Sequence, residues 1–176
     1  FIKNKKKKIS IYITLFLFLF FTNIVLNEEK KVIVGKAIVT DGDSLKIGND
    51  RIRLFGIDAF ELNQTCESKK YGKNHKCGRM AKLYLQTLVQ NRIIHCFYSE
   101  RDRYKRILGT CFGEVNSKIN DTWELNRMMV YSGYAVAYRK YSKRYIEEEE
   151  KANLDGTGLS NYNHYIHPEE WRRKNK

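Results

Sequence analysis

Apolar and polar positions alternate along much of the chain after residue 31, and this alternation predicts β-strands. The strands are expected at residues 32–39, 44–47, 51–57, 93–98 and 106–112. Gly35 interrupts the first strand and indicates a bend or bulge, and residues 48–50 (Gly-Asn-Asp) supply a hairpin turn between the second and third. The polar segment 63–76 is expected to be a loop.

Helical spacing occurs in three places, and the order of the elements indicates an α+β fold. A first helix presents one apolar face made of Met80, Ala81, Tyr84, Leu85 and Leu88. A second helix is expected to begin at a cap at Asp121–Thr122 and to end near Gly133, and a third covers residues 145–154. Residues 135–142 fit either a strand or a loop. Strands followed by helices, without an internal repeat, favour a small Greek-key barrel.

The N-terminal region differs from the rest of the chain. Five lysines, at positions 3 and 5–8, precede an apolar run over residues 9–26, which is the pattern of an export signal. The run approaches the ~20 residues that cross a bilayer, so a cleaved signal peptide and an uncleaved anchor both fit. We therefore expect an export or anchor segment at 1–30 and a folded domain at 31–176. The protein would be secreted, periplasmic or held on the outer face of a membrane.

The charge of the chain narrows the choice of partners. The net charge is +13, and the five lysines before residue 27 account for five of it, which leaves +8 for the rest. A basic folded domain favours polyanions, either nucleic acid or anionic lipid, although solubility alone would also explain the charge. A content of 42% hydrophobic residues is enough for a core and excludes a largely disordered chain.

Four cysteines, at positions 66, 77, 96 and 111, indicate disulfides, because their number is even and the predicted destination is oxidising. Their spacing does not resemble a zinc site. Three pairings are possible, and four free, partly buried thiols are the alternative. We predict Cys66–Cys77, which closes one loop, and Cys96–Cys111, which joins two neighbouring strands.

The densest chemistry lies in about twenty residues that contain Asp41, Asp43, Arg53, Asp58 and Glu61. Folding the hairpin at its turn places Asp43 roughly opposite Gly56, and Asp58 then emerges at the same end of the sheet. Two carboxylates at one place suit a hard cation such as calcium rather than zinc. Taken singly, each residue has an ordinary structural explanation, such as a tight turn or a surface ion pair. Their combination in a basic, exported chain has no such structural explanation and favours a functional site.

Such a set meets the needs of phosphodiester hydrolysis. A bound metal draws one phosphate oxygen and offsets negative charge, and an arginine such as Arg53 binds further oxygens. A carboxylate such as Glu61 activates or orients the attacking water. A second arginine is expected, and the best candidate is Arg106, at the start of a strand. Arg103, in the charged connection before it, is a further candidate for substrate binding.

These residues resemble the signature of the staphylococcal nuclease (thermonuclease) family, in which DGDT precedes RL-x-GID-x-PE. The corresponding segments here are DGDSLKI and RIRLFGIDAFE. The resemblance extends over residues 33–173 through CGRMAKLYLQTL, RDRYKR, NRMMVYSGYAVAYRKYSK and GTGLSNYNHYIHPEEWRR. The last of these segments resembles the closing Gly-Leu-Trp and Pro-x-x-Trp-Arg motifs of bacterial secreted members. It implies a five-stranded OB-fold-type barrel with three helices and a monomeric, calcium-dependent endonuclease that acts on DNA and RNA.

The resemblance also implies a role for each matching residue. Calcium would be held by the side chains of Asp43 and Asp58, by the backbone carbonyl of Ala59 and, from the outer shell, by Asp41. The phosphate would be bound by Arg53 and Arg106, the water by Glu61 as general base or orienting group, and the nucleotide by a pocket that Tyr138 lines. All the chemistry-bearing positions are filled, which favours an active enzyme.

Three positions depart from the family pattern. Phe60 replaces a proline that stiffens the turn before Glu61, so Phe60→Pro is expected to leave activity equal or higher. Lys105 stands where glycine is common, which disfavours a positive φ there. Ser160 replaces a tryptophan. None of the three removes a group with an expected chemical role.

Two other functions fit parts of the sequence. A binding module on the same barrel, attached to a membrane, would hold nucleic acid through basic grooves and aromatic stacking without cleaving it. An exported structural or lipid-associated protein would explain the charge and the anchor but leaves the acids without a use. Desolvated carboxylates repel a polyanion unless a cation intervenes, so a pure binder has no reason to carry three of them. The sequence therefore favours the enzyme.

Overall fold

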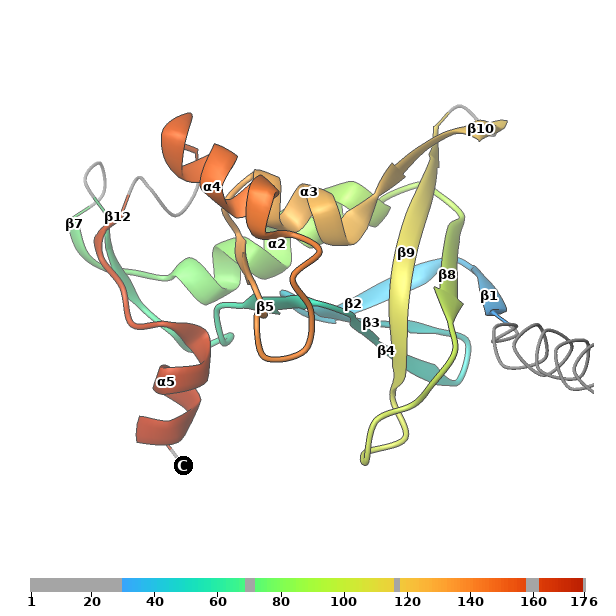
Figure 1. Cartoon of the computed structure of the whole chain (residues 1–176), viewed down its shortest axis with the longest axis horizontal. Helices are drawn as coiled ribbons and strands as arrows, with labels where there is room; N and C mark the ends of the chain where they lie inside the picture. Colours follow the sequence, from blue (N-terminus) through green and yellow to red (C-terminus); the bar gives the residue numbers. More distant parts are fainter. Residues whose placement is uncertain (1–29, 69–71, 116–117, 158–161, 176) are drawn as a thin grey trace, which may run out of the picture. The chain divides into compact units, whose positions relative to one another are not determined.

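The main β-sheet runs in the order β1-β8-β9-β4-β3-β2, with β10 attached to β9 (Figure 1). The structure is a computed structural model that describes residues 30–68, 72–115, 118–157 and 162–175. The strands are β1 Lys31–Gly35, β2 Ala37–Asp41, β3 Ser44–Ile47, β4 Asp50–Leu54, β8 Ile94–Tyr98, β9 Ile107–Val115 and β10 Lys118–Glu124. Neighbouring strands pair antiparallel, except for the parallel pair β4 and β9.

The chain itself joins the two ends of this sheet. β1 and β2 end the hydrogen-bonded path but are separated in sequence only by Lys36. A Cβ at Gly35 would lie 2.8 Å from Cγ2 of Ile47, so the bend that was predicted at this glycine also needs the space that a side chain would fill. Counted as one bent strand, β1 and β2 make a set of five strands with β3, β4, β8 and β9. This set is called the barrel below, although the hydrogen-bonded path is open at β1 and β2. Its core includes Leu45, Ile52, Leu54, Ile94 and Ile107.

Among the residues that the structure describes, the helices confirm the α+β class, and there are four of them rather than the expected three. They are α2 Cys77–Val89, α3 Leu125–Tyr131, α4 Ile146–Leu154 and α5 Pro168–Lys174. In Figure 1, α2, α3 and α4 lie together on one side of the strands, and α5 lies apart from them. The second helix begins later than its predicted cap at Asp121–Thr122, because residues 118–124 pair with β9 instead. Within the described residues, no helix is long and apolar enough to cross a bilayer, and the predicted export segment lies outside those residues.

Two small sheets replace segments that were expected to be one long strand and one loop. β5 Ile57–Ala59 pairs with β11 Ala135–Ala137, because the chain turns after β4 at Gly56, which has a φ of 79°. Within the predicted loop, β6 Cys66–Ser68 pairs with β7 Gly72–His75 and with β12 Tyr162–His164. The last of these pairings brings the C-terminal region beside the segment that follows β5.

Both predicted disulfides are confirmed. Cys96 and Cys111 are bonded and face each other across β8 and β9, inside the barrel core. Cys66 and Cys77 are bonded and tie β6 to the first residue of α2. All four cysteines are thus paired.

A buried asparagine joins α3 to the barrel. Asn126 is fully buried, and its Oδ1 accepts the N–H of Cys111 over 3.0 Å. Its Nδ2 donates to the carbonyls of Phe55 at 2.9 Å and Gly109 at 3.1 Å. One side chain therefore satisfies backbone groups of β9 and of the turn after β4, which is the turn that leads to Asp58.

We expect Asn126→Ala to lower the free energy of unfolding by about 2–4 kcal/mol, because it leaves buried groups such as the Cys111 N–H and the Phe55 carbonyl without this partner. Denaturant titration with the disulfides intact measures the change. The matched control is Lys174→Ala, which removes an exposed ion pair with Glu170, with a 2.8 Å separation, and should cost less than ~1 kcal/mol. Equal losses in the two variants would contradict the role of Asn126.

Candidate active site

The hairpin of β3 and β4 fixes the position of the first acids. Ile47 pairs with Asp50 across a two-residue turn. In this register Asp43 faces Leu54, whose N–H donates to the Asp43 carbonyl over 2.9 Å. The prediction that Asp43 lies opposite Gly56 is therefore wrong by two residues. The turn is one residue shorter than predicted, which accounts for one of the two.

Asp58 still reaches Asp43, because the chain folds back at Gly56. Asp58 is fully buried and Asp43 is 5% exposed. Arg53 on β4 joins them: its Nη1 lies 2.6 Å from Oδ1 of Asp43, and its Nη2 lies 2.9 Å from Oδ1 of Asp58. Burial opposes the charge of Arg53, but the two carboxylates together raise its pKa above the ordinary value. The guanidinium therefore stays charged and holds the two acids at one place.

Asp41 and Ala59 lie beside this pair. Burial, reinforced by the charges of Asp43 and Glu61, raises the pKa of Asp41 to about 6, although the Gly42 N–H donates to its carboxylate over 2.8 Å. A Cβ on Gly42 would lie 2.8 Å from the Cβ of Ala59, so the glycine lets the turn pack directly on β5. The Ala59 N–H donates to Oδ2 of Asp43 over 3.3 Å. The structure thus brings the predicted metal-binding residues together.

Glu61 follows β5 in a turn that α2 braces. Gln64 is fully buried; its N–H donates to the Glu61 carbonyl over 2.7 Å, and its Oε1 accepts the Glu61 N–H over 3.2 Å. Gly78, in the first turn of α2, donates its N–H to the Gln64 carbonyl over 3.2 Å. A Cβ on Gly78 would lie 1.7 Å from the Glu61 carbonyl oxygen. The helix can therefore approach the Glu61 turn only at a glycine.

An arginine without a predicted role completes the site. Arg172 of α5 places Nη1 2.8 Å from Oδ1 of Asp58 and 2.7 Å from Oε1 of Glu61, and Nη2 2.8 Å from Oδ2 of Asp58. Although burial opposes it, these contacts raise the pKa of Arg172 above its ordinary value. The closing Pro-x-x-Trp-Arg motif contains this residue, but the motif does not indicate which groups the arginine contacts.

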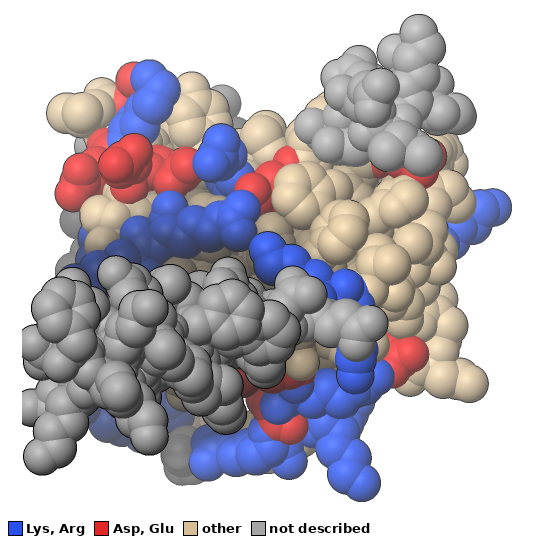
Figure 2. All heavy atoms as spheres, turned by 45° about the vertical axis from the view of Figure 1, so that its right-hand side comes forward, with Lys and Arg blue, Asp and Glu red and all other residues tan. Residues whose placement is uncertain are grey.

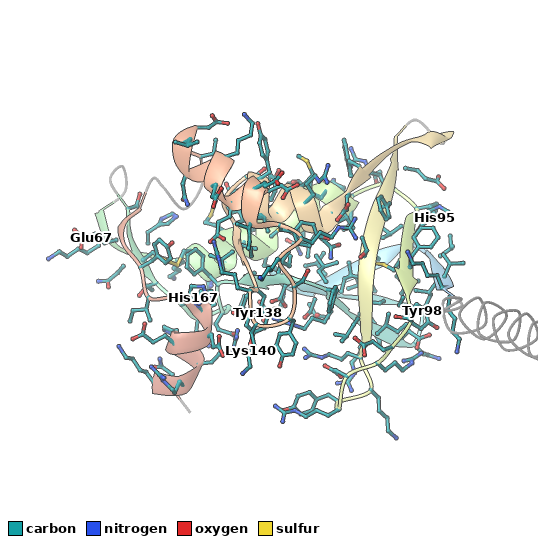
Figure 3. All side chains as sticks on the ribbon, viewed as in Figure 1. Glu67, His95, Tyr98, Tyr138, Lys140 and His167 are labelled. Carbon is teal, nitrogen blue, oxygen red and sulfur yellow. A yellow bond between two sulfur atoms is a disulfide. The ribbon has the colours of Figure 1, made fainter. Side chains whose placement is uncertain are left out.

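Tyr138 borders the same cluster from the segment after β11. Its N–H donates to the Gly56 carbonyl over 2.9 Å, and the Arg172 guanidinium carbon lies 6.0 Å from the centre of its ring. Figure 3 shows Tyr138 and Lys140 on this segment, near His167 at the start of α5. The predicted nucleotide-binding tyrosine is therefore adjacent to the acids, and α5 contacts both.

Arg106 and Arg103 do not join the acid cluster. The side chain of Arg106 is paired with Asp102, with an Nη2–Oδ2 separation of 2.7 Å. The guanidinium of the exposed Arg103 lies 5.1 Å from the Tyr104 ring centre. Lys105 has a φ of 63°, contrary to the expectation drawn from its side chain. Asp102 accounts for this strained turn, because its Oδ1 accepts the N–H groups of Tyr104 and Arg106.

Comparison with known proteins matches the chain to one family. Residues 51–160 match the family model described as staphylococcal nuclease homologue. The chain belongs to this family. The predicted resemblance is thereby confirmed, together with the class of enzyme, a hydrolase of the nuclease type.

Three relatives illustrate the range of this nuclease family. The succinoglycan biosynthesis protein ExoI of Rhizobium meliloti is 33% identical over 129 residues, which cover 72% of this chain and 64% of that protein, less than two thirds of its length. An uncharacterized endonuclease of Haemophilus influenzae is 30% identical over 167 residues, or 91% and 84% of the two chains. A micrococcal nuclease of Shigella flexneri is 29% identical over 148 residues, or 78% and 79%.

The donors at the site of this family member fit a hard divalent cation. Asp43 and Asp58 contribute anionic oxygens, the ligand type that calcium and magnesium prefer. Within residues that the structure describes, no three Asp, Glu, His or Cys side chains are placed to hold a metal by themselves. Two carboxylates supplemented by backbone and solvent oxygens suit a cation with six to eight oxygen ligands better than a four-coordinate zinc site.

The position that carries a proline in the family pattern has a packing role in this nuclease. Phe60 is 2% exposed and lies in a small apolar cluster with Cys66, Cys77 and Val136. Its ring meets Tyr165 edge to face, with the centroids 5.5 Å apart. The cluster joins the turn before Glu61 to the disulfide and to the segment that precedes α5. The expectation for Phe60→Pro therefore changes.

We now expect Phe60→Pro to lower the free energy of unfolding by about 3 kcal/mol or more, because a buried aromatic ring is lost. Nuclease activity should fall as the temperature approaches the lowered unfolding midpoint. Thermal unfolding and an activity–temperature series measure both effects. Phe60→Leu, which keeps apolar volume, should lose less stability; a proline variant as stable as the unchanged chain would refute the packing role.

We expect Gly78→Ala to reduce the rate of cleavage at least tenfold, because the added Cβ forces α2 and the Glu61 turn apart and a small misplacement of a catalytic group is costly. Initial rates under saturating substrate measure the change. Arg79→Ala, at the next and exposed position of the same helix, is the control and should stay within about twofold. Unchanged activity in Gly78→Ala would show that the turn tolerates displacement.

Proposed function

We propose that this chain is an exported, calcium-dependent endonuclease that hydrolyses phosphodiester bonds of DNA, RNA or both. The observation that carries the proposal is the buried pair Asp43 and Asp58, joined by Arg53 with both N–O separations under 3 Å. Glu61 lies in the same cluster, because Arg172 bridges it to Asp58. Membership in a family of metal-dependent nucleases supports the assignment.

Each group has a task in this reaction. Calcium would be held by Asp43, Asp58 and the Ala59 carbonyl, with Asp41 in the outer shell. When bound, it would polarise the phosphate and offset developing negative charge. Arg53 presents a fixed guanidinium for the non-bridging phosphate oxygens, and the Glu61 carboxylate orients the attacking water or accepts its proton.

Arg106 must change partners to take part. It is paired with Asp102, and its side chain is 27% exposed. The parallel register pairs Leu108 of β9 with Arg53 of β4, and Arg106 directly precedes β9. Arg106 binds one oxygen of Asp102 through both Nε, at 2.8 Å, and Nη2, at 2.7 Å. A phosphate offers two oxygens to the same guanidinium and can therefore replace this acid. Arg106 then becomes the second arginine of the phosphate clamp.

The surface supports a nucleic-acid substrate. In Figure 2, Lys and Arg side chains form a band across the middle of the view and a second group along its lower edge. The connection between β8 and β9 contributes four cations, Arg101, Arg103, Lys105 and Arg106. Such a surface attracts the phosphate backbone of either nucleic acid without reading its sequence. Tyr138 offers an aromatic ring for a base next to the acids.

Export is the proposal that best accounts for the N-terminal pattern and the disulfides together. A basic and then apolar segment precedes residue 27, and both cysteine pairs are oxidised. Disulfides persist outside the cytoplasm. Whether residues 9–26 are removed or hold the protein at the membrane is decided by the mass of the mature protein from membrane and soluble fractions.

We expect single-stranded DNA to be cleaved in calcium and left intact in chelator. Glu61→Gln, Asp43→Asn and Arg106→Ala should each lower the cleavage rate by about 100-fold or more. The full chain, with its disulfides formed, is incubated with labelled DNA and the products are resolved by length. Glu150→Gln, an exposed residue of α4, is the matched control and should keep full activity.

The same assay separates the enzyme from the alternative. A membrane-tethered binding module would retain DNA, with an affinity that falls as salt rises, and would cleave it in no metal. That result would refute the proposed hydrolysis. Cleavage that continues in chelator would refute the calcium dependence and leave a nuclease with another mechanism.

A further inference from the structure

The guanidinium of Arg172 occupies the groups that the proposed calcium ion needs. Asp58 Oδ1 accepts N–H groups from both Arg53 and Arg172, and Asp58 Oδ2 accepts a second one from Arg172. The same Nη1 of Arg172 also reaches Glu61 at 2.7 Å. One side chain therefore neutralises both the expected metal ligand and the expected water-orienting carboxylate.

A divalent cation and Arg172 cannot share Asp58 without repulsion. Calcium lies 2.3–2.6 Å from its oxygen ligands, and the Arg172 nitrogens lie 2.8 Å from the Asp58 oxygens. Two positive charges would then sit within a few ångströms of each other in a site whose carboxylate is fully buried. On the side where Arg172 contacts both of its oxygens, the Asp58 carboxylate can bind only one cation at a time. Binding of the metal there therefore requires Arg172 to withdraw.

Arg172 is the cation that is able to leave. Arg53 extends from the barrel strand β4 and is fixed by acids on two sides, with its side chain 16% exposed. The Arg172 side chain is 30% exposed and extends from a seven-residue helix in which only Pro168 is buried. A change of rotamer is enough to move its guanidinium toward solvent or toward a bound phosphate.

The chain also holds this helix at its start, independently of Arg172. Nε2 of the buried Gln64 donates to the Ile166 carbonyl just before α5, and Glu169 lies 3.6 Å from Lys140. Gln64 also binds both backbone groups of Glu61: its N–H donates to the Glu61 carbonyl, and its Oε1 accepts the Glu61 N–H. Gln64 therefore fixes the segment that leads into α5 relative to the Glu61 turn. This fixed start of the helix positions Arg172 beside Asp58 and Glu61.

We propose that Arg172 is an internal counter-cation, which neutralises Asp58 and Glu61 in the metal-free nuclease and leaves them when a divalent cation binds. This inference rests on the proposed calcium site. It predicts that the enzyme binds calcium more weakly than its acids alone would, and that Arg172 stabilises the metal-free form. In that form the acids are held in place and do not repel an approaching polyanion.

Calorimetric titration of the full chain with calcium, in mild detergent, tests the competition. Arg172→Met keeps most of the apolar stem and removes the charge; we expect it to bind calcium at least tenfold more tightly than the unchanged chain. Arg173→Met is the matched control, since it makes the same charge change at the next, exposed position, and should stay within about twofold. Arg172→Lys, which keeps the charge but cannot bridge three oxygens, should fall between them.

Thermal unfolding provides a second readout that does not depend on catalysis. In chelator, Arg172→Met should unfold several degrees below the unchanged chain, because Asp58 loses a partner for its buried charge. Calcium should raise its unfolding temperature more than it raises that of the unchanged chain. A merely structural Arg172 would give the first effect without the second.

The outcomes separate this inference from the proposed function. If the unchanged chain binds calcium and Arg172→Met binds it equally or more weakly, the competition is refuted while the calcium site stands. If neither protein binds calcium, the calcium site is refuted and the competition with it, and the cleavage assay then decides whether another metal serves the nuclease. If Arg172→Met binds calcium more tightly than the unchanged chain and Arg173→Met does not, the exchange of Arg172 for the metal ion is established.

Discussion

The fully buried carboxylate of Asp58 is the constraint on which the arrangement of this nuclease depends. A buried charge without partners costs several kcal/mol, or else takes up a proton. Asp58 has such partners, because its carboxylate accepts N–H groups from Arg53 on β4 and from Arg172 on α5. Pro168 is the only buried residue of α5. The position of this helix therefore depends on polar contacts: Arg172, 114 residues after Asp58, binds that acid, and Gln64 binds the Ile166 carbonyl just before the helix.

The backbone around these charges is fixed by close approach at two glycines. Gly42 lets the first acidic turn lie against Ala59, and Gly78 lets α2 meet the carbonyl of Glu61. Both contacts leave no space for a Cβ, so the turns that carry Asp43 and Glu61 cannot slide independently. The arginines set the charge balance of the site, and the glycines set its geometry. Consistent local and long-range constraints of this kind define a single arrangement.

Features that depend on local periodicity and chemistry could be predicted from the sequence, whereas those that depend on long-range contacts could not. Alternation located the barrel strands, and proximity in adjacent strands was enough to predict Cys96–Cys111. Asp43 lies two residues from its predicted register. One residue of turn length already moves the partner of every position on the strand by one, and the sequence does not fix that length. The role of Arg172 was missed because neither the Pro-x-x-Trp-Arg motif nor its spacing contains information about Asp58. Lys105 adopts a positive φ because Asp102 holds the turn, which its own residue type does not indicate.

The two arginines expected to bind phosphate, Arg53 and Arg106, differ in the acids that restrain them. This difference determines which of the two can bind a phosphate first. Arg106 is held by one acid, Asp102, and that acid keeps its two backbone N–H donors when a phosphate takes its place at the guanidinium. Arg53 compensates two buried acids, and a phosphate that draws it away leaves their charge unbalanced unless another cation supplies it. Under the proposed mechanism, phosphate binding at Arg53 is therefore coupled to occupation of the metal site, whereas binding at Arg106 is not. A polyanion can be captured at the β8–β9 connection first and is clamped for hydrolysis only when the acids are neutralised by the metal.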